Sequence, residues 1–183
     1  MNFIDTIKDR WHLLGGEDGP AACIDPAPYL LLTVSQWLAF RAQWPAGMKV
    51  GVAIGNAADV EDIAADLPLI DLVALNFPKW VDGRAYSQAH LLRARYRFAG
   101  EVRATGEVLV DMLPLLQRSG FDSVVLRADQ SQDAARRALT FFPGHYQADT
   151  TDPLPLFGKP PGTGDALARA AAVKEFINEG ASI

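Results

Sequence analysis

The sequence predicts an α/β fold with a mostly parallel sheet built from consecutive βα units. Short apolar runs typical of buried strands occur at residues 29–32, 49–54, 72–75, 101–104 and 121–127. Helical patterns separate these runs, and strands joined by spacers of this length pair in parallel through right-handed crossovers. The pattern is compatible with an open sheet and with a partial barrel.

The length and composition fit one globular domain. The chain has 183 residues, of which 49% are hydrophobic and 21% are charged, and a chain of this length can bury a sizeable core without disulfides. Residues 143–164 are rich in proline and glycine, which predicts an irregular connector. We therefore expect a single α/β domain over residues 1–158, followed by a linker and a C-terminal helix within 159–183.

Charge and residue counts argue against several classes of function. The formal net charge of −5 disfavours a nucleic-acid binder, because phosphate contacts require an excess of lysine and arginine. No apolar run approaches the ~20 residues of a membrane span, and no secretion signal is visible. The lone cysteine, Cys23, favours a reducing cytoplasm. The three histidines lie far from it and from one another, so no metal site is expected.

The N-terminal part is expected to be an accessory flap. Apolar and polar residues alternate over residues 3–14 around Lys8 and Asp9, a pattern typical of a small hairpin. Residues 15–20 contain three glycines and a proline that interrupt regular structure, and residues 21–24 could form a short strand. We expect this hairpin to lie on the main sheet.

Capping and stop signals place the helices between the strands. Thr33 and Gln36 have the spacing of a capping box, which predicts a helix through Phe40. Further helices are expected at 59–68, 85–98, 108–119 and from Asp129 to 141–142.

Two segments leave alternatives open. Pro114 falls harmlessly in the first turn of its helix if Asp111 is the cap, but it kinks the helix if the helix begins at Glu107. The C-terminal helix, capped by Asp165 and running over 166–178, could dock on its own domain or on a neighbouring subunit. The second option would make the protein a homodimer.

Polar side chains follow the strands at their carboxyl ends, where parallel α/β folds usually bind ligands. The strand ends supply Gly55, Asn56, Asn76, Lys79, Asp82, Arg84, Thr105, Gly106, Glu107, Arg127 and Asp129. Cations beside carboxylates could bind a small oxyanion or a phosphate group. The opposite edge is also polar, with Lys49, Asp71, Glu101 and Asp122, so composition alone does not single out the carboxyl edge.

The loop at residues 76–87 is the most informative part of that edge. Its candidate ligand-binding residues are Asn76, Lys79, Arg84 and Tyr86. Asp82 is a candidate catalytic group, and Gly83 beside it permits a tight bend. Residues 82–84 could equally form a turn in which Asp82 bonds its own backbone, and Tyr86 could equally anchor the core.

Arg103 and Glu107 complete the set of candidates. Arg103 lies inside a short strand expected to be covered, and a buried arginine needs a paired carboxylate, for which Glu107 and Asp82 are candidates. A structural ion pair that ties loop to strand is slightly favoured there over a role in catalysis. Glu107 is the second candidate catalytic carboxylate.

Several motifs resemble an uncharacterised bacterial family. They are FPKWVDGRAYS at 77–87, LLR at 91–93, EVRATGEVL at 101–109, Asp111, and GFD at 120–122, within a similarity that covers 29–147. Members of that family carry a domain of unknown function and are often described as oxidoreductases involved in sulfite reduction. Glu107 stands where members usually have Asp, and Met112 stands where they tend to have Gln after Asp111; the pair Pro114–Leu115 is also unusual.

The resemblance implies a role in assimilatory sulfur metabolism and leaves two classes of function. The favoured one is an accessory protein that binds a small anionic ligand, sulfite reductase, or both. The other is an enzyme in which Asp82 or Glu107 handles protons while Lys79, Arg84 and Arg103 hold an anionic substrate. The chain has no cysteine pair, dinucleotide fingerprint or iron–sulfur ligand set. The cofactor is therefore unknown, and an oxidoreductase would have to borrow a flavin or work within a complex.

Overall fold

The computed structural model describes residues 1–14, 24–141 and 148–150, together with Leu154 and Gly158. Its strands are β1 (Asn2–Phe3), β2 (His12–Leu13), β3 (Leu30–Thr33), β4 (Val50–Ile54), β5 (Leu72–Phe77), β6 (Glu101–Gly106) and β7 (Ser123–Val124). Its α-helices are α1 (Val34–Phe40), α2 (Arg84–His90), α3 (Leu113–Ser119) and α4 (Gln132–Ala138). Helical segments of other types are η1 (Arg41–Gln43), η2 (Val60–Leu69), η3 (Leu91–Arg95) and η4 (Val110–Met112). No described helix is long and apolar enough to cross a bilayer.

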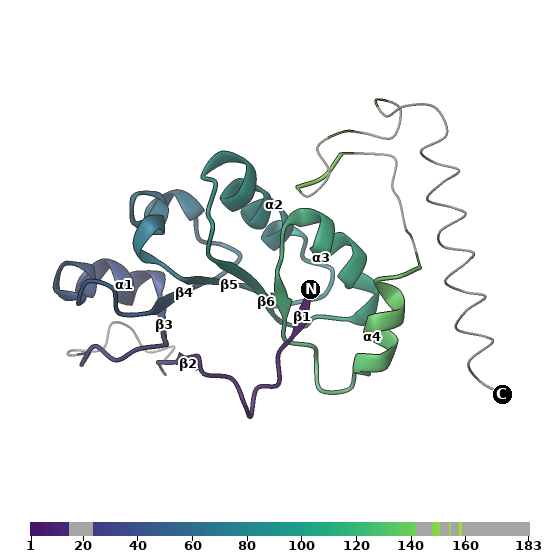
Figure 1. Ribbon diagram of the computed structural model, residues 1–183, viewed down its shortest axis with the longest axis horizontal. Helices are drawn as coiled ribbons and strands as arrows, with labels where there is room; N and C mark the ends of the chain where they lie inside the picture. Colours follow the sequence, from purple (N-terminus) through teal and green to yellow (C-terminus); the bar gives the residue numbers. More distant parts are fainter. Residues whose placement is uncertain (15–23, 142–147, 151–153, 155–157, 159–183) are drawn as a thin grey trace.

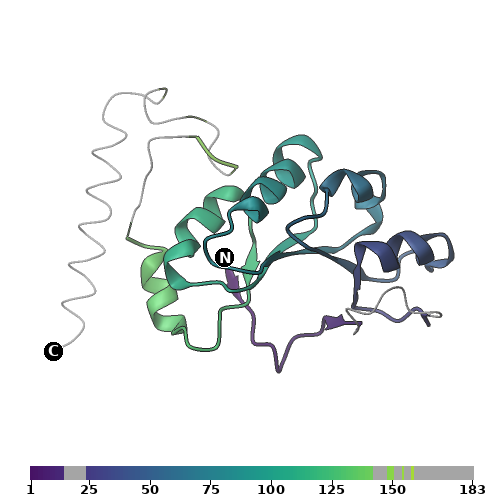
Figure 2. The ribbon, with the colours of Figure 1, turned by 180° about the vertical axis from the view of Figure 1, so that it is seen from behind.

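The described strands form one parallel sheet in the order β1-β7-β6-β5-β4-β3-β2. From β3 to β7, each strand lies beside its neighbour in sequence. Right-handed crossovers that all proceed in one direction place their helices on the same side of a sheet. The helices therefore cover one face, and the sheet curls into an open half-barrel (Figures 1 and 2). The predicted parallel α/β fold is confirmed, and it takes the form of a partial barrel.

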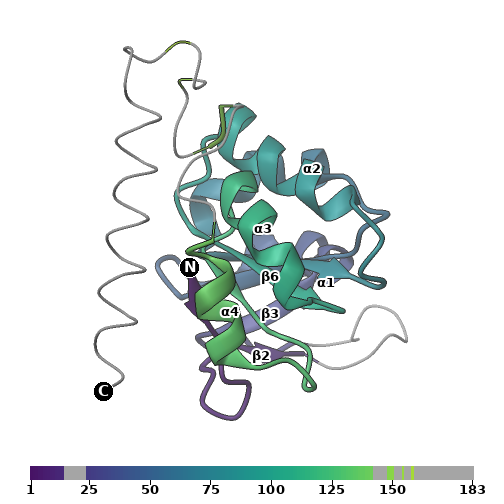
Figure 3. The ribbon, with the colours of Figure 1, turned by 90° about the vertical axis from the view of Figure 1, so that its right-hand side faces the viewer.

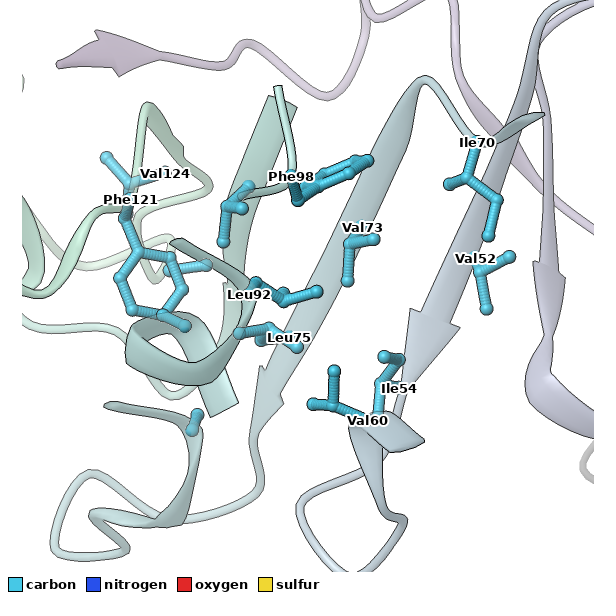
Figure 4. Packing of buried hydrophobic residues seen from close by; sticks show 14 of the residues in the cluster. Val52, Ile54, Val60, Ile70, Val73, Leu75, Leu92, Phe98, Phe121 and Val124 are labelled. Carbon is cyan, nitrogen blue, oxygen red and sulfur yellow. The ribbon is translucent and has the colours of Figure 1, made fainter. Parts of the chain in front are cut away.

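The apolar core lies between this sheet and its helices. Val52 and Ile54 of β4, and Val73 and Leu75 of β5, are at most 1% exposed. Figure 4 shows them on the same side as Leu92, which comes from the helical layer and is fully buried. Burial of each such side chain contributes about 1.5–3 kcal/mol, so this layer holds the helices against the sheet.

The N-terminal segment does not form the expected hairpin. β1 pairs with β7, with Asn2 beside Ser123, whereas β2 pairs with β3 at the opposite edge, with His12 beside Leu30. Residues 4–11, the crossing segment, pass over the face of the sheet that lies away from the helices (Figures 1 and 3). The alternating pattern predicted extended structure, but each end pairs with an existing strand because the edges of an open sheet offer unpaired N–H and C=O groups.

Trp11 fixes the end of the crossing segment on the sheet. A Cβ atom built on Gly51 would lie 3.0 Å from the Trp11 ring, so β4 has room for the indole only because it carries glycine there. The ring also meets Tyr29 edge-on, with centroids 5.4 Å apart. Residues 1–14 therefore lie on the main sheet as expected, although they do not form a hairpin; the strand considered at 21–24 lies largely outside the described residues.

Some helices match their predicted form and others differ in type or boundary. The capping box at the start of α1 is confirmed. The helix expected over 59–68 is instead the 3₁₀ helix η2, which spans Val60–Leu69, and the helix expected over 85–98 changes from α2 into the π-helical turn η3. α4 is capped by Ser131 rather than Asp129, because the Asp129 carboxylate binds Arg127.

The open question at Pro114 is resolved by where α3 begins. Pro114 lies in the first turn of α3, where its missing N–H costs little, although Met112 rather than Asp111 precedes the helix. Gly120 ends α3 with a left-handed conformation at φ 98°. The C-terminal helix predicted over 166–178 lies outside the described residues.

Carboxylates close the amino ends of β4 and β6, the two strands that flank β5. Asp71 accepts a hydrogen bond from the first N–H of β4 at 3.1 Å and also pairs with Lys49. Asp122 accepts from the second N–H of β6 at 2.8 Å and pairs with Arg93. The polarity of this edge is therefore explained by structural contacts.

Gly106, at the end of β6, should be intolerant of substitution. Its φ is +90°, and a Cβ atom there would lie 2.4 Å from the carbonyl oxygen of Phe77. Gly106→Ala should lower the free energy of unfolding by about 2 kcal/mol or more, from backbone strain and this clash. Urea denaturation measures the effect. Gly55→Ala is the control, because a Cβ there meets nothing within 4 Å; equal effects of the two variants would contradict the prediction.

Candidate functional site

The structure gathers some of the predicted site residues into two clusters and leaves the others apart. Asp82 and Arg84 bind each other beside Asn56, at the carboxyl ends of β4 and β5. Glu107 joins Arg127 and Asp129 at the carboxyl ends of β6 and β7. The remaining members, Asn76, Lys79, Tyr86 and Arg103, belong to neither cluster. The expected single pocket is therefore not formed by these residues together.

The first cluster is a bidentate pair held by two loops. Arg84, the first residue of α2, donates from Nε to one oxygen of Asp82 at 3.0 Å and from Nη2 to the other at 2.7 Å. Its backbone N–H also donates to Asp82 at 3.3 Å, and the Asn56 amide donates to the same carboxylate from the loop after β4. The turn considered for residues 82–84 therefore forms, and the Arg84 side chain binds the carboxylate that accepts from its backbone N–H.

This pairing determines the charge state of Asp82. The hydrogen bonds from Arg84 lower the pKa of Asp82 from its ordinary 3.8 to about 2, with a further contribution from Asn56. The same contact raises the pKa of Arg84. Asp82 is therefore ionised at any physiological pH and holds the guanidinium in a fixed orientation.

Gln88 is a part of this cluster that the sequence did not indicate. Its amide nitrogen donates to the carbonyls of Gly55 at 3.0 Å and Ala58 at 2.9 Å, and so fixes the loop that carries Asn56. The side chain is only 7% exposed. The helical pattern places Gln88 off the apolar stripe, and its carbonyl partners become neighbours only when α2 lies beside the loop that follows β4.

The loop before Arg84 displays apolar side chains to solvent. Trp80 is 57% exposed and Val81 is 65% exposed. Lys79 precedes them and is also exposed. Because aromatic and arginine side chains dominate binding energy at protein interfaces, this combination beside Arg84 is suited to recognition. We call residues 79–84 the recognition loop.

The second cluster holds one arginine between two carboxylates. Arg127 donates to both oxygens of Asp129 at 2.7 Å and to Glu107 at 2.9 Å. These hydrogen bonds raise the pKa of Arg127 and lower the pKa of Asp129 to about 2. Nowhere in the described part of the chain do three or more His, Cys, Asp or Glu side chains form a group that could hold a metal ion.

Asn76 and Tyr86 lie apart from both ionic clusters. Asn76 is exposed at the end of β5, and its side-chain oxygen lies over Gly106, 2.5 Å from where a Cβ atom would be. Tyr86 packs edge-on against Phe77, with centroids 5.2 Å apart, and also contacts Phe121. Burial raises the pKa of Tyr86. Its ring therefore anchors α2 on the core, one of the two roles predicted for it.

Arg103 is on the other side of the sheet, and neither of its predicted partners binds it. It is 4% exposed and faces the crossing segment, where it pairs with Asp9 and, at 2.9 Å, with Glu101. Ser123 on β7 also accepts a hydrogen bond from it at 3.3 Å. Alternation along β6 directs residue 103 away from the helices, so it cannot meet Glu107 or Asp82. The structural ion pair favoured from the sequence is what forms.

The fold and the two ionic clusters define a class: a singly wound parallel α/β half-barrel with paired charges at the carboxyl edge of its sheet. Within that class, residues 51–157 match a family described as "Bacterial protein of unknown function (DUF934)". The chain belongs to this family, as the motifs in the sequence indicated. None of the curated proteins is similar enough to this chain to be recognised as a relative.

The low pKa of Asp82 can be tested by titration. Arg84→Gln removes the main cause of the shift, so the carboxyl midpoint should move from about 2 toward 3.8. Because the pKa is lowered in the folded state, the stabilising contribution of Asp82 is complete above pH 3.8 and is lost as the pH falls through 2. Carbon-detected NMR of the carboxyl group measures the midpoint. Arg136→Gln, on α4, should not change it, and a wild-type midpoint near 3.8 would refute the assignment.

The buried Arg103 pair should contribute strongly to stability. Asp9→Ala leaves the guanidinium with Glu101 as its only carboxylate partner among the described residues. We expect a loss of about 2–3 kcal/mol, less than the ~3–5 kcal/mol seen when a buried charge loses its sole partner. Chemical denaturation measures it. Lys8→Ala is the control, since that side chain is 84% exposed and should change stability by less than ~0.5 kcal/mol.

Proposed function

We propose that this protein is a non-catalytic accessory protein of assimilatory sulfur metabolism. Its recognition loop binds a small oxyanion and docks on sulfite reductase. The observation that carries the proposal is the fixed Asp82–Arg84 pair beside two exposed apolar side chains. The sulfur pathway and the partner come from the family resemblance of the motifs at 77–87 and 101–109, and a cytoplasmic location is part of the same proposal.

The electrostatics of the candidate carboxylates favour recognition over catalysis. A general base works best when its pKa lies near the working pH, whereas the pKa of Asp82 is about 2. Glu107 is bound to Arg127 at 2.9 Å. The alternative, an enzyme using Asp82 or Glu107 with Arg84 and Arg103, is also disfavoured by the burial of Arg103 on the opposite face.

Arg84 has the geometry of an anion receptor. An arginine side chain carries five N–H donors. The described contacts engage two of them, the Nε–H and one N–H on Nη2. The remaining donors, on Nη1 and Nη2, are available to an oxyanion because the side chain is 59% exposed. Asp82 and Asn56 hold the guanidinium in place, which reduces the entropy lost on binding.

The exposed side chains of the same loop support a protein partner. Trp80 and Val81 together present an apolar surface, and tryptophan and arginine are enriched among the residues that dominate interface energy. A matching partner would have an apolar pocket for Trp80, with acidic side chains around it to bind Lys79 and Arg84.

The proposal is tested by measuring binding to a purified bacterial sulfite reductase. Trp80→Ala and Arg84→Gln should each weaken the complex by about tenfold or more, because both remove central contacts. Leu69→Ala and Arg95→Gln are matched controls: each is similarly exposed and lies near the amino edge of the sheet. Absence of a complex, or equal binding by all four variants, would refute the docking role.

A second measurement tests whether Arg84 binds an oxyanion. Sulfite, sulfate and phosphate are added separately, and thermal unfolding is followed. At least one oxyanion should raise the melting temperature of wild type and of Arg95→Gln, but not of Arg84→Gln, because binding to the native state stabilises it. A shift that persists in Arg84→Gln would place the anion elsewhere.

A further inference from the structure

A pocket at the β1 edge of the same rim is separate from the recognition loop. It has a volume of about 200 Å³ and lies between residues 3–6 and 125–128, with Gln130 and Gln132 beside them. Pockets for drug-sized ligands have volumes of about 300–1,000 Å³. This one therefore suits a ligand of only a few non-hydrogen atoms.

Backbone pairing fixes the two walls relative to each other. β1 and β7 are parallel neighbours, and the Ile4 N–H donates to the Val124 carbonyl at 2.9 Å. On the second wall, the Arg127 N–H donates to the Val108 carbonyl at 3.1 Å, and Gln130 accepts from the Val110 N–H at 3.1 Å. The pocket is thus built from segments more than a hundred residues apart in sequence that the sheet holds together.

The first wall carries a carboxylate, that of Asp5, which can still accept hydrogen bonds. One oxygen of Asp5 accepts the Ile7 N–H at 3.0 Å, and the other has a single long contact, 3.8 Å, to Lys8. Lys8 is 84% exposed, so this contact is weak. Asp5 itself is 45% exposed and can accept a further hydrogen bond from a cationic donor.

The second wall carries a pre-oriented arginine. Asp129 and Glu107 engage three of the five N–H groups of Arg127, which leaves one donor on Nη1 and one on Nη2 without a partner among the described residues. The side chain is 35% exposed. Two N–H groups on one guanidinium match the two oxygens of a carboxylate.

From these walls we infer that the pocket binds a small zwitterion of the α-amino acid class, with its ammonium group on Asp5 and its carboxylate on Arg127. A simple anion fits poorly, since Glu107 and Asp129 already bind the single guanidinium and a further carboxylate, Asp5, lines the same pocket. A simple cation would leave the donors of Arg127 unused. Thr6, Gln130 and Gln132 also line the pocket.

The test uses L-serine as the probe on the full-length protein, followed by amide NMR shifts and calorimetry. L-serine should bind and shift amides within 4–6 and 125–132. Acetate and methylammonium at the same concentration should bind about tenfold more weakly or not at all, because each lacks one of the two charged contacts. Equal binding of either single-charge probe, or no binding of L-serine, would overturn the inference.

Two variants assign the contacts. Asp5→Asn and Arg127→Lys should each weaken L-serine binding by about tenfold, the first by removing the anionic acceptor and the second by replacing the planar fork with a point charge. Asp133→Asn and Arg95→Gln are controls of the same chemical types elsewhere and should bind as wild type. If Arg127→Lys fails to fold, Asp5→Asn alone decides the test. That variant should fold, because Asp5 is half-exposed. Unchanged affinity in Asp5→Asn would refute the proposal, and neither result affects the test of the recognition loop.

Discussion

Arg103 places a positive charge on the face of the sheet that has no helices, and the N-terminal segment is held there because that charge requires carboxylates. A guanidinium that is 4% exposed would be costly without them. Glu101 supplies one carboxylate from the same strand, and Asp9 supplies the other from the crossing segment. The contact holds that segment against β6 between the two edges of the half-barrel, so the N-terminal residues are an integral part of the sheet.

The order of the strands explains why one face of the sheet has no helices and is left for the crossing segment to cover. Because β3 to β7 follow one another in sequence order, their helices all lie on one side. A sheet with strand-order reversal would have helices on both sides and a crevice at the reversal. This sheet lacks such a reversal among those strands, so its ligand sites are expected along the carboxyl edge, as in closed barrels of the same winding.

Charged residues occur at both edges of the sheet but are bound differently. At the amino edge, Asp71 and Asp122 are bound to strand N–H groups as well as to cations, and they complete the backbone hydrogen bonding. At the carboxyl edge, Asp82 and Asp129 mainly orient arginines that keep unused donors. Carboxylates that hold arginines are suited to recognition, because their own pKa values are too low for proton transfer near neutrality.

The sequence by itself determined the α/β class, the parallel pairing, the capping box at Thr33 and the turn considered at residues 82–84. These depend on residues within a few positions of one another or on spacer lengths, which the sequence displays directly. Only the tertiary structure decided that the N-terminal segment joins both edges of the sheet and that Arg103 meets Asp9. The Asp9–Arg103 ion pair joins residues 94 positions apart, and β1 and β7 lie still further apart in sequence. Both contacts form because curling of the sheet brings its uncovered face within reach of a segment whose local pattern is equally compatible with a hairpin.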